Sequence, residues 1–151
     1  MIKGLIFVCQ KVDYMNNMRD LKDFNIKTLK ESFPKSSQVG LGEDFCIFDV
    51  RYDTDIEKDL SSPRRLEGNI ILFCVRGSIR MSINLNEFDI VEGSLIIVTA
   101  QDIVKVERIY SKVPEELHFI MIAMSDNFVS DLKIDFRKIL NEGITLIETP
   151  V

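Results

Sequence analysis

The sequence has few of the side chains that build metal centres. It contains one histidine, His118, and three cysteines, Cys9, Cys46 and Cys74. The cysteines are far apart and set in apolar surroundings, and no Cys-x-x-Cys pair or Cys/His cluster has zinc-ligand spacing. We therefore expect no zinc site and interpret each cysteine as a small core residue in a reducing compartment.

Long apolar runs and a surplus of positive charge are also missing. No segment approaches the roughly 18 consecutive apolar residues of a membrane-spanning helix, and the apolar run at 4–9 is too short for a secretory signal peptide. The net charge is −5, which argues against nucleic-acid binding by this chain alone. No glycine-rich phosphate loop is present. These absences predict a cytoplasmic protein with no membrane contact.

What the sequence does contain is a β-hairpin over residues 69–85. A continuous apolar run, Ile70 to Val75, meets the pair Arg76-Gly77, and beyond this pair apolar and polar residues alternate. Gly77 supplies the positive φ that a tight hairpin turn needs. This hairpin is the element around which we expect the rest of the chain to be organised.

Further strands are predicted at short and regular spacing. Turn signals at Asn86-Glu87, Glu92-Gly93 and Gln101-Asp102 separate strands at 45–52, 69–75, 78–85, 87–91, 95–99, 103–110 and 117–124. We interpret 35–44 as a loop and 53–67 as a second loop exposed to solvent. The rhythm predicts a mainly β fold, a barrel or sandwich of about seven or eight antiparallel strands.

A short helix is predicted before the strands and one or two helices after them. Asn25 is placed to cap the first, and Pro34 ends it. Asp126 is expected to cap a C-terminal helix with an apolar stripe. We divide the chain into an extension at 1–18 (with a natural start at Met15 or Met18), a helix and barrel at 19–124, and a C-terminal helix and tail at 125–151.

The order of these elements resembles a known family. A short N-terminal helix, the barrel sequence ILFCVRGSIRMSIN and the helix start MSDNFVSDL are similar to the cupin-like sensor domain of AraC-type transcriptional regulators, above all those of Bacteroides-like bacteria. The resemblance covers most of residues 25–151. It implies a barrel that binds a small-molecule effector or mediates homodimer contacts. It also implies a helix-turn-helix domain, absent from this chain, that binds DNA.

The same resemblance bears on metal binding. Catalytic cupins hold a metal inside the barrel with histidines and a glutamate. Aligning the hairpin turn with theirs puts the glutamate at Ile70, the paired histidines near Arg64 and Leu66, and the last histidine near Val104. None of these side chains can replace an imidazole or a carboxylate as a ligand. We therefore predict no metal, no cofactor and no catalytic residue.

Strand alternation predicts the side chains that face the barrel interior. If Ile70 faces the interior, the ligand-binding candidates are Leu72, Cys74, Met81, Ile83, Val104, Val106 and Arg108. Arg108 is the charged member, and its guanidinium could hold an anionic effector by a bidentate contact. His118 is either a hydrogen-bonded core residue or a polar anchor for the ligand, and we include it. Equally, these side chains could fill a small barrel that has no cavity.

Two further sites are interpreted from the pattern alone. The pair Arg64-Arg65 lies in an otherwise acidic stretch, so we interpret it as solvated surface. The C-terminal helix offers an apolar face for either core cover or a homodimer about a two-fold axis. The candidate dimer residues are Phe128, Leu132, Phe136 and Ile139.

The sequence therefore predicts a non-catalytic effector-sensing or dimerisation domain of an AraC-type regulator. The alternative is a stand-alone, metal-free cupin enzyme of the sugar isomerase or epimerase type. That alternative needs His118 to face an open pocket beside a second titratable group. A cyclic-nucleotide-type barrel is disfavoured, because its phosphate-binding cassette is missing.

Overall fold

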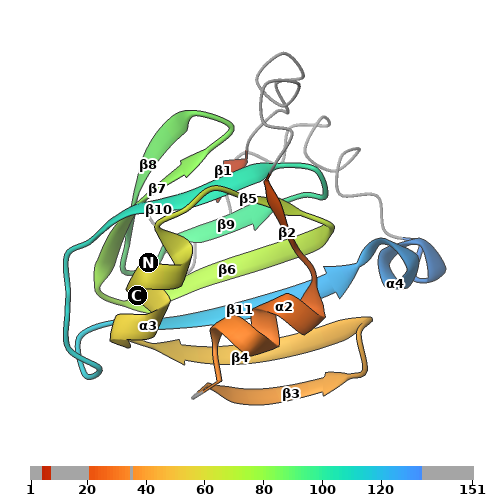
Figure 1. The fold of residues 1–151 in the computed structure, drawn as a ribbon, viewed down its shortest axis with the longest axis horizontal. Coiled ribbons are helices and arrows are strands. Elements are labelled where there is room, and N and C mark those ends of the chain that lie inside the picture. The colour runs from red at the N-terminus through yellow and green to blue at the C-terminus, as the bar shows by residue number, and fades with distance from the viewer. Residues whose placement is uncertain (1–4, 8–20, 35, 134–151) are drawn as a thin grey trace.

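Two β-sheets enclose one hydrophobic core in the computed structural model, which describes residues 5–7, 21–34 and 36–133 (Figure 1). The first sheet has the strand order β1 (Leu5–Phe7), β9 (Leu95–Val98), β6 (Gly68–Arg76), β11 (His118–Ser125), β4 (Phe45–Arg51) and β3 (Ser37–Leu41). The second has the order β2 (Lys22–Phe24), β5 (Arg64–Leu66), β10 (Ile103–Ile109), β7 (Ser78–Ile83) and β8 (Asn86–Val91). The prediction of a mainly β fold with few helices is confirmed.

Two strand pairings differ from the predicted antiparallel arrangement. β1 pairs with β9 in parallel, and β2 pairs with β5 in parallel. Both β1 and β2 are three-residue strands at the edges of their sheets. Strands this short carry too few residues for alternation to reveal them, so neither pairing is predictable from the sequence.

The two strands of the predicted hairpin are present as β6 and β7, but the prediction that they pair as a hairpin is wrong. β6 pairs with β9 and β11 in the first sheet, whereas β7 pairs with β8 and β10 in the second, so the turn between them connects the two sheets. Gly77 has a φ of 89° between the two strands, as the turn requires. The next turn lies at Asn84 and Leu85, with φ values of 50° and 73°, two residues ahead of the predicted turn at Asn86-Glu87. Positive φ at both central residues matches the twist of antiparallel strands, which explains why the chain turns there.

The two predicted loops contain regular structure. The stretch 35–44 includes β3, which pairs antiparallel with β4, and 53–67 includes β5 and the helix α3 (Thr54–Leu60). In β3, Val39 is 72% exposed, so its outward apolar side chain does not follow the usual pattern of a half-buried strand. In α3, Ile56 and Leu60 share one face, but seven residues are too few to show a helical period.

The N-terminal cap prediction is confirmed in detail. In α2 (Ile26–Ser32), the Asn25 side chain accepts from the Thr28 backbone N–H at 2.9 Å, and the Thr28 hydroxyl accepts from the Asn25 N–H at 2.9 Å. These reciprocal bonds form a capping box. Helices α2 and α3 lie next to each other in front of the sheets in Figure 1.

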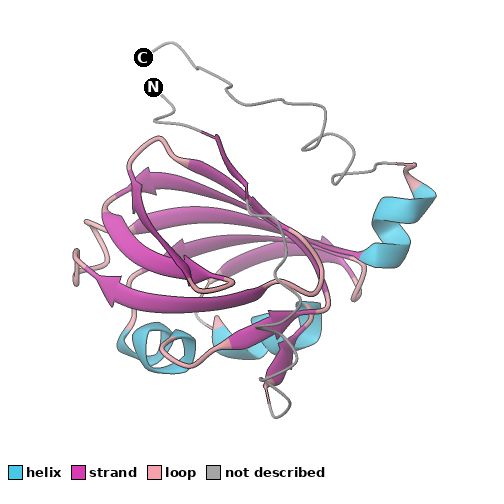
Figure 2. Ribbon diagram, turned by 90° about the horizontal axis from the view of Figure 1, so that it is seen from above, coloured by secondary structure: helices cyan, strands magenta, loops and turns pink. Residues whose placement is uncertain are grey.

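The C-terminal helix begins where predicted but with a different cap. In α4 (Asp126–Asp131), the cap is Ser125, whose hydroxyl accepts from the Phe128 N–H at 3.1 Å. Figure 2 shows α4 beyond the end of β11, projecting from the sheets. Residues 134–151 lie outside the described residues. Among those that are described, no helix is long and apolar enough to cross a membrane.

A buried polar network holds two neighbouring turns together. Asp102 is 1% exposed, and its carboxylate accepts from the Asn84 amide at 2.9 Å, the Thr99 N–H at 3.0 Å and the Thr99 hydroxyl at 3.1 Å. Asn84 in turn accepts from the Ile103 N–H at 2.9 Å. These bonds offset the cost of burying a charged group, so the network is structural.

We predict that the two described cysteines are unreactive in the folded protein. Cys46 and Cys74 are buried, and burial raises the pKa of the Cys74 thiol to about 12 and raises that of Cys46. The thiolate, which is the reactive form, is therefore scarce at about pH 8. In a Cys9→Ser variant, a thiol reagent should label both cysteines only after unfolding in guanidinium. Rapid labelling of the native protein would contradict this burial.

Candidate ligand-binding site

An apolar cavity of about 90 Å³ lies between the two sheets. From the first sheet its wall includes Val50, Ile70, Leu72, Phe119 and Met121. From the second it includes Arg64, Leu66, Met81, Val104 and Val106. Helices α2 and α3 cover it with Leu29, Ile56 and Leu60. Pockets for small molecules are mostly apolar with a few polar anchors, so this cavity is the candidate binding site.

Strand alternation placed most of the predicted interior residues correctly. Leu72, Met81, Val104 and Val106 line the cavity. Cys74 and Ile83 are fully buried in the core, but neither is on the cavity wall. The interior face was therefore predictable, while the position of the cavity along that face was not.

The prediction that Arg108 faces the interior is wrong. In β10, Val106 pairs with Met81 and Arg108 pairs with Arg80, so two residues of β10 advance against one of β7. This β-bulge reverses the alternation. Ile109 is therefore buried on the inside, whereas the exposed Arg108 stacks on the Tyr110 ring, with its guanidinium carbon 5.0 Å from the ring centre.

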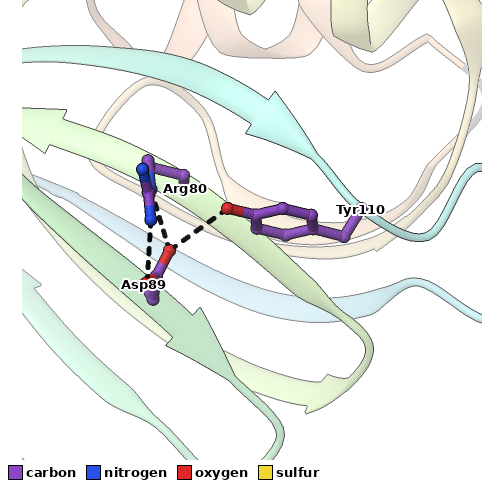
Figure 3. A network of polar contacts seen from close by, with 3 residues as sticks. All are labelled: Arg80, Asp89 and Tyr110. Atoms are coloured by element: carbon purple, nitrogen blue, oxygen red, sulfur yellow. Dashed lines mark hydrogen bonds and ion pairs between the residues drawn. The ribbon is translucent and has the colours of Figure 1, made fainter.

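Through its stacking on Tyr110, Arg108 lies beside a polar cluster on the outer face of the second sheet. Figure 3 shows the other members of this cluster, Arg80, Asp89 and Tyr110. Arg80 donates to both carboxylate oxygens of Asp89, at 3.0 and 3.1 Å, and the Tyr110 hydroxyl lies 3.5 Å from the same carboxylate. The bonds from Arg80 hold the pKa of the Asp89 carboxyl below its usual value. Because these side chains are exposed, the pair contributes little to stability.

The prediction that His118 is an interior anchor is also wrong. In β11, Phe119 and Met121 face the cavity, so His118 points to the opposite face. Its Nε2 lies 2.8 Å from Oδ1 of Asp49. Both atoms are buried and have no other hydrogen-bond partner, while the Arg51 Nε lies 3.8 Å from the same Oδ1. We assign the proton to Nε2, because two acceptors at this distance would repel. His118 is thus bonded outside the cavity.

The interpretation of Arg64 as solvated surface is wrong, because this residue lines the cavity. It pairs with Val104 in the sheet, and both side chains line the cavity. The alternation Arg64, Leu66 before the run at 69–75 was the available signal, but two adjacent arginines concealed it. The other cationic residue on the wall, Lys105, has its ammonium 3.1 Å from the Glu107 carboxylate.

The four positions that the cupin resemblance assigns to metal ligands all lie on the cavity wall. These positions are Ile70, Arg64, Leu66 and Val104. The alignment therefore places all four positions together in the fold, but none of the four side chains present is a metal ligand. Within residues 5–7, 21–34 and 36–133, no group of three His, Cys, Asp or Glu residues is placed to hold a metal ion.

A polar clamp fixes α3 over the cavity. The Glu57 carboxylate accepts from the Tyr52 hydroxyl and from the Lys112 ammonium, both at 2.9 Å. The bond from Lys112, followed by that from Tyr52, holds the pKa of the Glu57 carboxyl below its usual value of 4.5. Since Ile56 and Leu60 cover the cavity, this clamp restrains the helix that closes it.

We predict that the Glu57 clamp weakens in acid. Because the folded pKa of Glu57 is lowered, its stabilisation is present above pH 4.5 and is lost as the pH falls through the folded pKa. The difference in unfolding free energy between wild type and Glu57→Gln should therefore shrink with falling pH. Lys112→Met should raise the pKa of Glu57 towards 4.5. A difference that is independent of pH would contradict the clamp.

The candidate dimer face is only partly described. The Phe128 ring packs against the Phe45 ring of β4, with centres 5.4 Å apart, while Leu132 is 52% exposed. Phe136 and Ile139 lie outside the described residues. An intramolecular contact thus accounts for part of the predicted apolar stripe, and a dimer through this helix stays a prediction.

Comparisons with known proteins give likeness in fold only. No family model and no curated protein sequence matches the chain. The cupin domain of Schizosaccharomyces pombe Cnp3 is similar at 15% identity and a TM-score of 0.46, covering 68% of this chain and 73% of that one. KdgF from Halomonas sp. is similar at 13% identity and a TM-score of 0.44, and the match covers 61% of this chain and 80% of that one. The Photorhabdus luminescens protein plu4264 is similar at 24% identity and a TM-score of 0.42, and the match covers 65% of this chain and 83% of that one.

Proposed function

We propose that this chain is the effector-sensing and dimerisation domain of an AraC-type transcriptional regulator. The observation that carries the proposal is the apolar cavity between the sheets, covered by two short helices. A ligand in this cavity would contact Ile56 and Leu60 of α3. Its binding would therefore act directly on α3, which lies at the surface. Such coupling of an internal ligand to the surface is what a sensor needs.

The wall of the cavity favours binding over catalysis. Among the described residues that line it, the ionisable side chains are Arg64 and Lys105, and neither a carboxylate nor an imidazole is present. An isomerase or epimerase needs a group that moves a proton at the substrate. His118, the candidate for that role, is bonded to Asp49 on the other face of its strand. We therefore favour the regulatory module over the enzyme.

An exposed apolar edge supports the homodimer. β3 is the edge strand of the first sheet, and its residues Val39 and Leu41 are 72% and 68% exposed. An edge strand with unpaired backbone groups and apolar side chains is a favourable site for pairing with another chain. A second copy presenting the same edge would form a closed two-fold contact.

The test is a chimeric repressor. Residues 1–151 are fused to a helix-turn-helix domain that represses a reporter gene only as a dimer. We expect repression that members of a small-molecule library alter, and a loss of repression in the double variant Val39→Lys, Leu41→Lys. Leu132→Lys tests the helix face in parallel. A folded chimera that is monomeric and insensitive to the library would contradict the proposal.

A second check needs only the coding sequence. We expect the reading frame beyond Val151 to encode helix-turn-helix sequences, because a sensor of this type acts through a DNA-binding domain. An adjoining sequence that encodes an unrelated domain would contradict the assignment to the AraC type, while the cavity would still be open to test by ligand binding.

A further inference from the structure

We propose that two copies of this chain form their homodimer through the outer face of the first sheet, with the two sheets packed face to face. This assignment rests on the homodimer of the proposed function and says which surface forms it. It is carried by a row of aliphatic side chains on that face, by the contrast with the second sheet, and by the area and charge of the face.

One row of side chains crosses five neighbouring strands on the side of the first sheet that points away from the cavity. In β6, Ile70 and Leu72 line the cavity, so Ile71 between them points to the outer face. The pairing of the strands continues this position in both directions, and the row consists of Ile97, Ile71, Ile122, Ile47 and Val39. The first four are partly exposed and Val39 is 72% exposed. The outer face is therefore aliphatic from β9 to β3.

The second sheet shows how a face that meets water is built in this chain. Its outer side carries polar residues that bond to one another, with Arg80 donating to Asp89 and Ser82 donating to Glu107. Apolar residues inside and polar residues outside are the usual alternation of an antiparallel sheet with one solvated face. The run from Ile70 to Val75 in β6 is instead apolar on both sides, which is typical of a strand covered on both faces. The composition of the first sheet therefore predicts a cover for its outer face.

Polar or packed groups mark two ends of this aliphatic face. At one end His118 is bonded to Asp49. At the other end the Phe128 ring of α4 packs on the Phe45 ring of β4. An apolar centre inside a polar rim is the usual anatomy of a protein–protein interface, so the row of Ile71 and Ile122 is the part that remains for a partner.

A second copy of the chain fits this face in area and in charge. Six strands of three to nine residues give a flat outline of roughly 550 Å², at about 4.8 Å between strands and about 3.3 Å per residue. Two such faces in contact would bury on the order of 1,100 Å², which clears the roughly 1,000 Å² expected of a specific interface. Each copy has a net charge of −5, and an uncharged row avoids the repulsion that a contact between acidic surfaces would meet.

The symmetry of a homodimer also suits the position of the row. β6 and β11 are the central strands of the first sheet, so a two-fold axis beside Ile71 and Ile122 would pack the row of each copy against that of the other. Packed sheets lie about 10 Å apart with their side chains interdigitated. Val39 belongs to the same row, so this contact would bury exposed side chains of the β3 edge as well.

The experiment measures the Kd of the dimer for the full chain by analytical ultracentrifugation. We expect wild type to dimerise, and Ile71→Lys to raise the Kd at least about tenfold, because the lysine would be buried without a partner at the centre of the contact. Ser82→Lys places the same side chain on the outer face of the second sheet, so it is the matched control and should keep the wild-type Kd. A dimer formed only by the β3 edges would not respond to Ile71→Lys, since β11 and β4 separate β6 from β3.

A second variant protects the test against misfolding. In Ile122→Thr the new residue is β-branched like isoleucine and keeps the strand preference, but it puts a hydroxyl into the centre of the contact. Its Kd should rise while its circular dichroism matches that of wild type. A dimer whose Kd is unchanged in both variants would overturn the face-to-face contact and leave the homodimer of the proposed function to the β3 edge. A wild type that stays monomeric because the chain covers its own sheet would overturn both forms of dimer, and the small-molecule library then decides separately whether the sensor function stands.

Discussion

Phe48→Ala should lower the unfolding free energy by about 3–5 kcal/mol, the range for truncating a buried phenylalanine. Phe48 is fully buried in the middle of β4, and its ring packs against the Phe33 ring with the centres 5.9 Å apart. Removing it takes the contact away from the end of α2 and leaves a void that the two sheets cannot fill. Since a domain is stable by about 5–15 kcal/mol, the loss is a large fraction of the total.

The control for this prediction is Phe45→Ala in the same strand. Phe45 is only partly buried, so its truncation should cost less than half as much. Denaturation in urea, monitored by far-ultraviolet circular dichroism, gives both values. Equal losses for the two variants would contradict the placement of Phe48 at the centre of the core and of Phe45 near its edge.

Gly77→Ala should be the second most damaging change, with a loss of about 2–5 kcal/mol. Two costs combine here. The φ of 89° is unfavourable for any residue with a side chain, at about 1–2 kcal/mol. In addition, an added Cβ would overlap the backbone oxygen of Glu116, and forcing extra atoms into a packed region costs about 1–3 kcal/mol.

Gly42→Ala separates these two costs. Gly42 also has a positive φ, of 55°, but an added Cβ there meets nothing within 4 Å. Its replacement should therefore cost only the backbone strain of about 1–2 kcal/mol. The two variants are compared by thermal and urea unfolding. Equal losses would mean that the turn between β6 and β7 has room beside Glu116, contrary to the packing described above.

The strands of the core were predictable because their side chains alternate between two environments. Phe45 to Arg51 and Ser78 to Ile83 show this most clearly, with every second residue buried. The turns at Gly77 and Gly93 were predictable because the chain needs a positive φ there. Local chemistry decides these features, so one sequence is enough to find them.

Features that depend on distant partners were not predictable. β5 contains two arginines, and it is a strand because β2 and β10 pair with it on either side. Arg108 points outwards because of a bulge whose position depends on the pairing of β10 with β7. The direction of His118 follows from β11, where its neighbours Leu117 and Phe119 are both buried. The sequence contains no local sign of these pairings.

The candidate site was therefore predicted in part. Leu72, Met81, Val104 and Val106 follow from alternation and line the cavity. An arginine was also expected among the interior residues, and the residue found on the wall is Arg64 in place of Arg108. The cover by α3 was missed, because Ile56 and Leu60 lie in a charged stretch that was interpreted as a loop.

The most direct test of the account is whether a small molecule enters the cavity. Met81 and Met121 line it, whereas the buried Met124 does not. Methyl-labelled methionine allows each to be followed by nuclear magnetic resonance during titration with benzyl alcohol, with Met→Leu variants for assignment. We predict saturable shifts of the Met81 and Met121 methyl resonances, caused by the ring of the probe, and a much smaller shift of Met124. Unchanged Met81 and Met121 resonances at saturating benzyl alcohol would contradict a ligand-binding cavity.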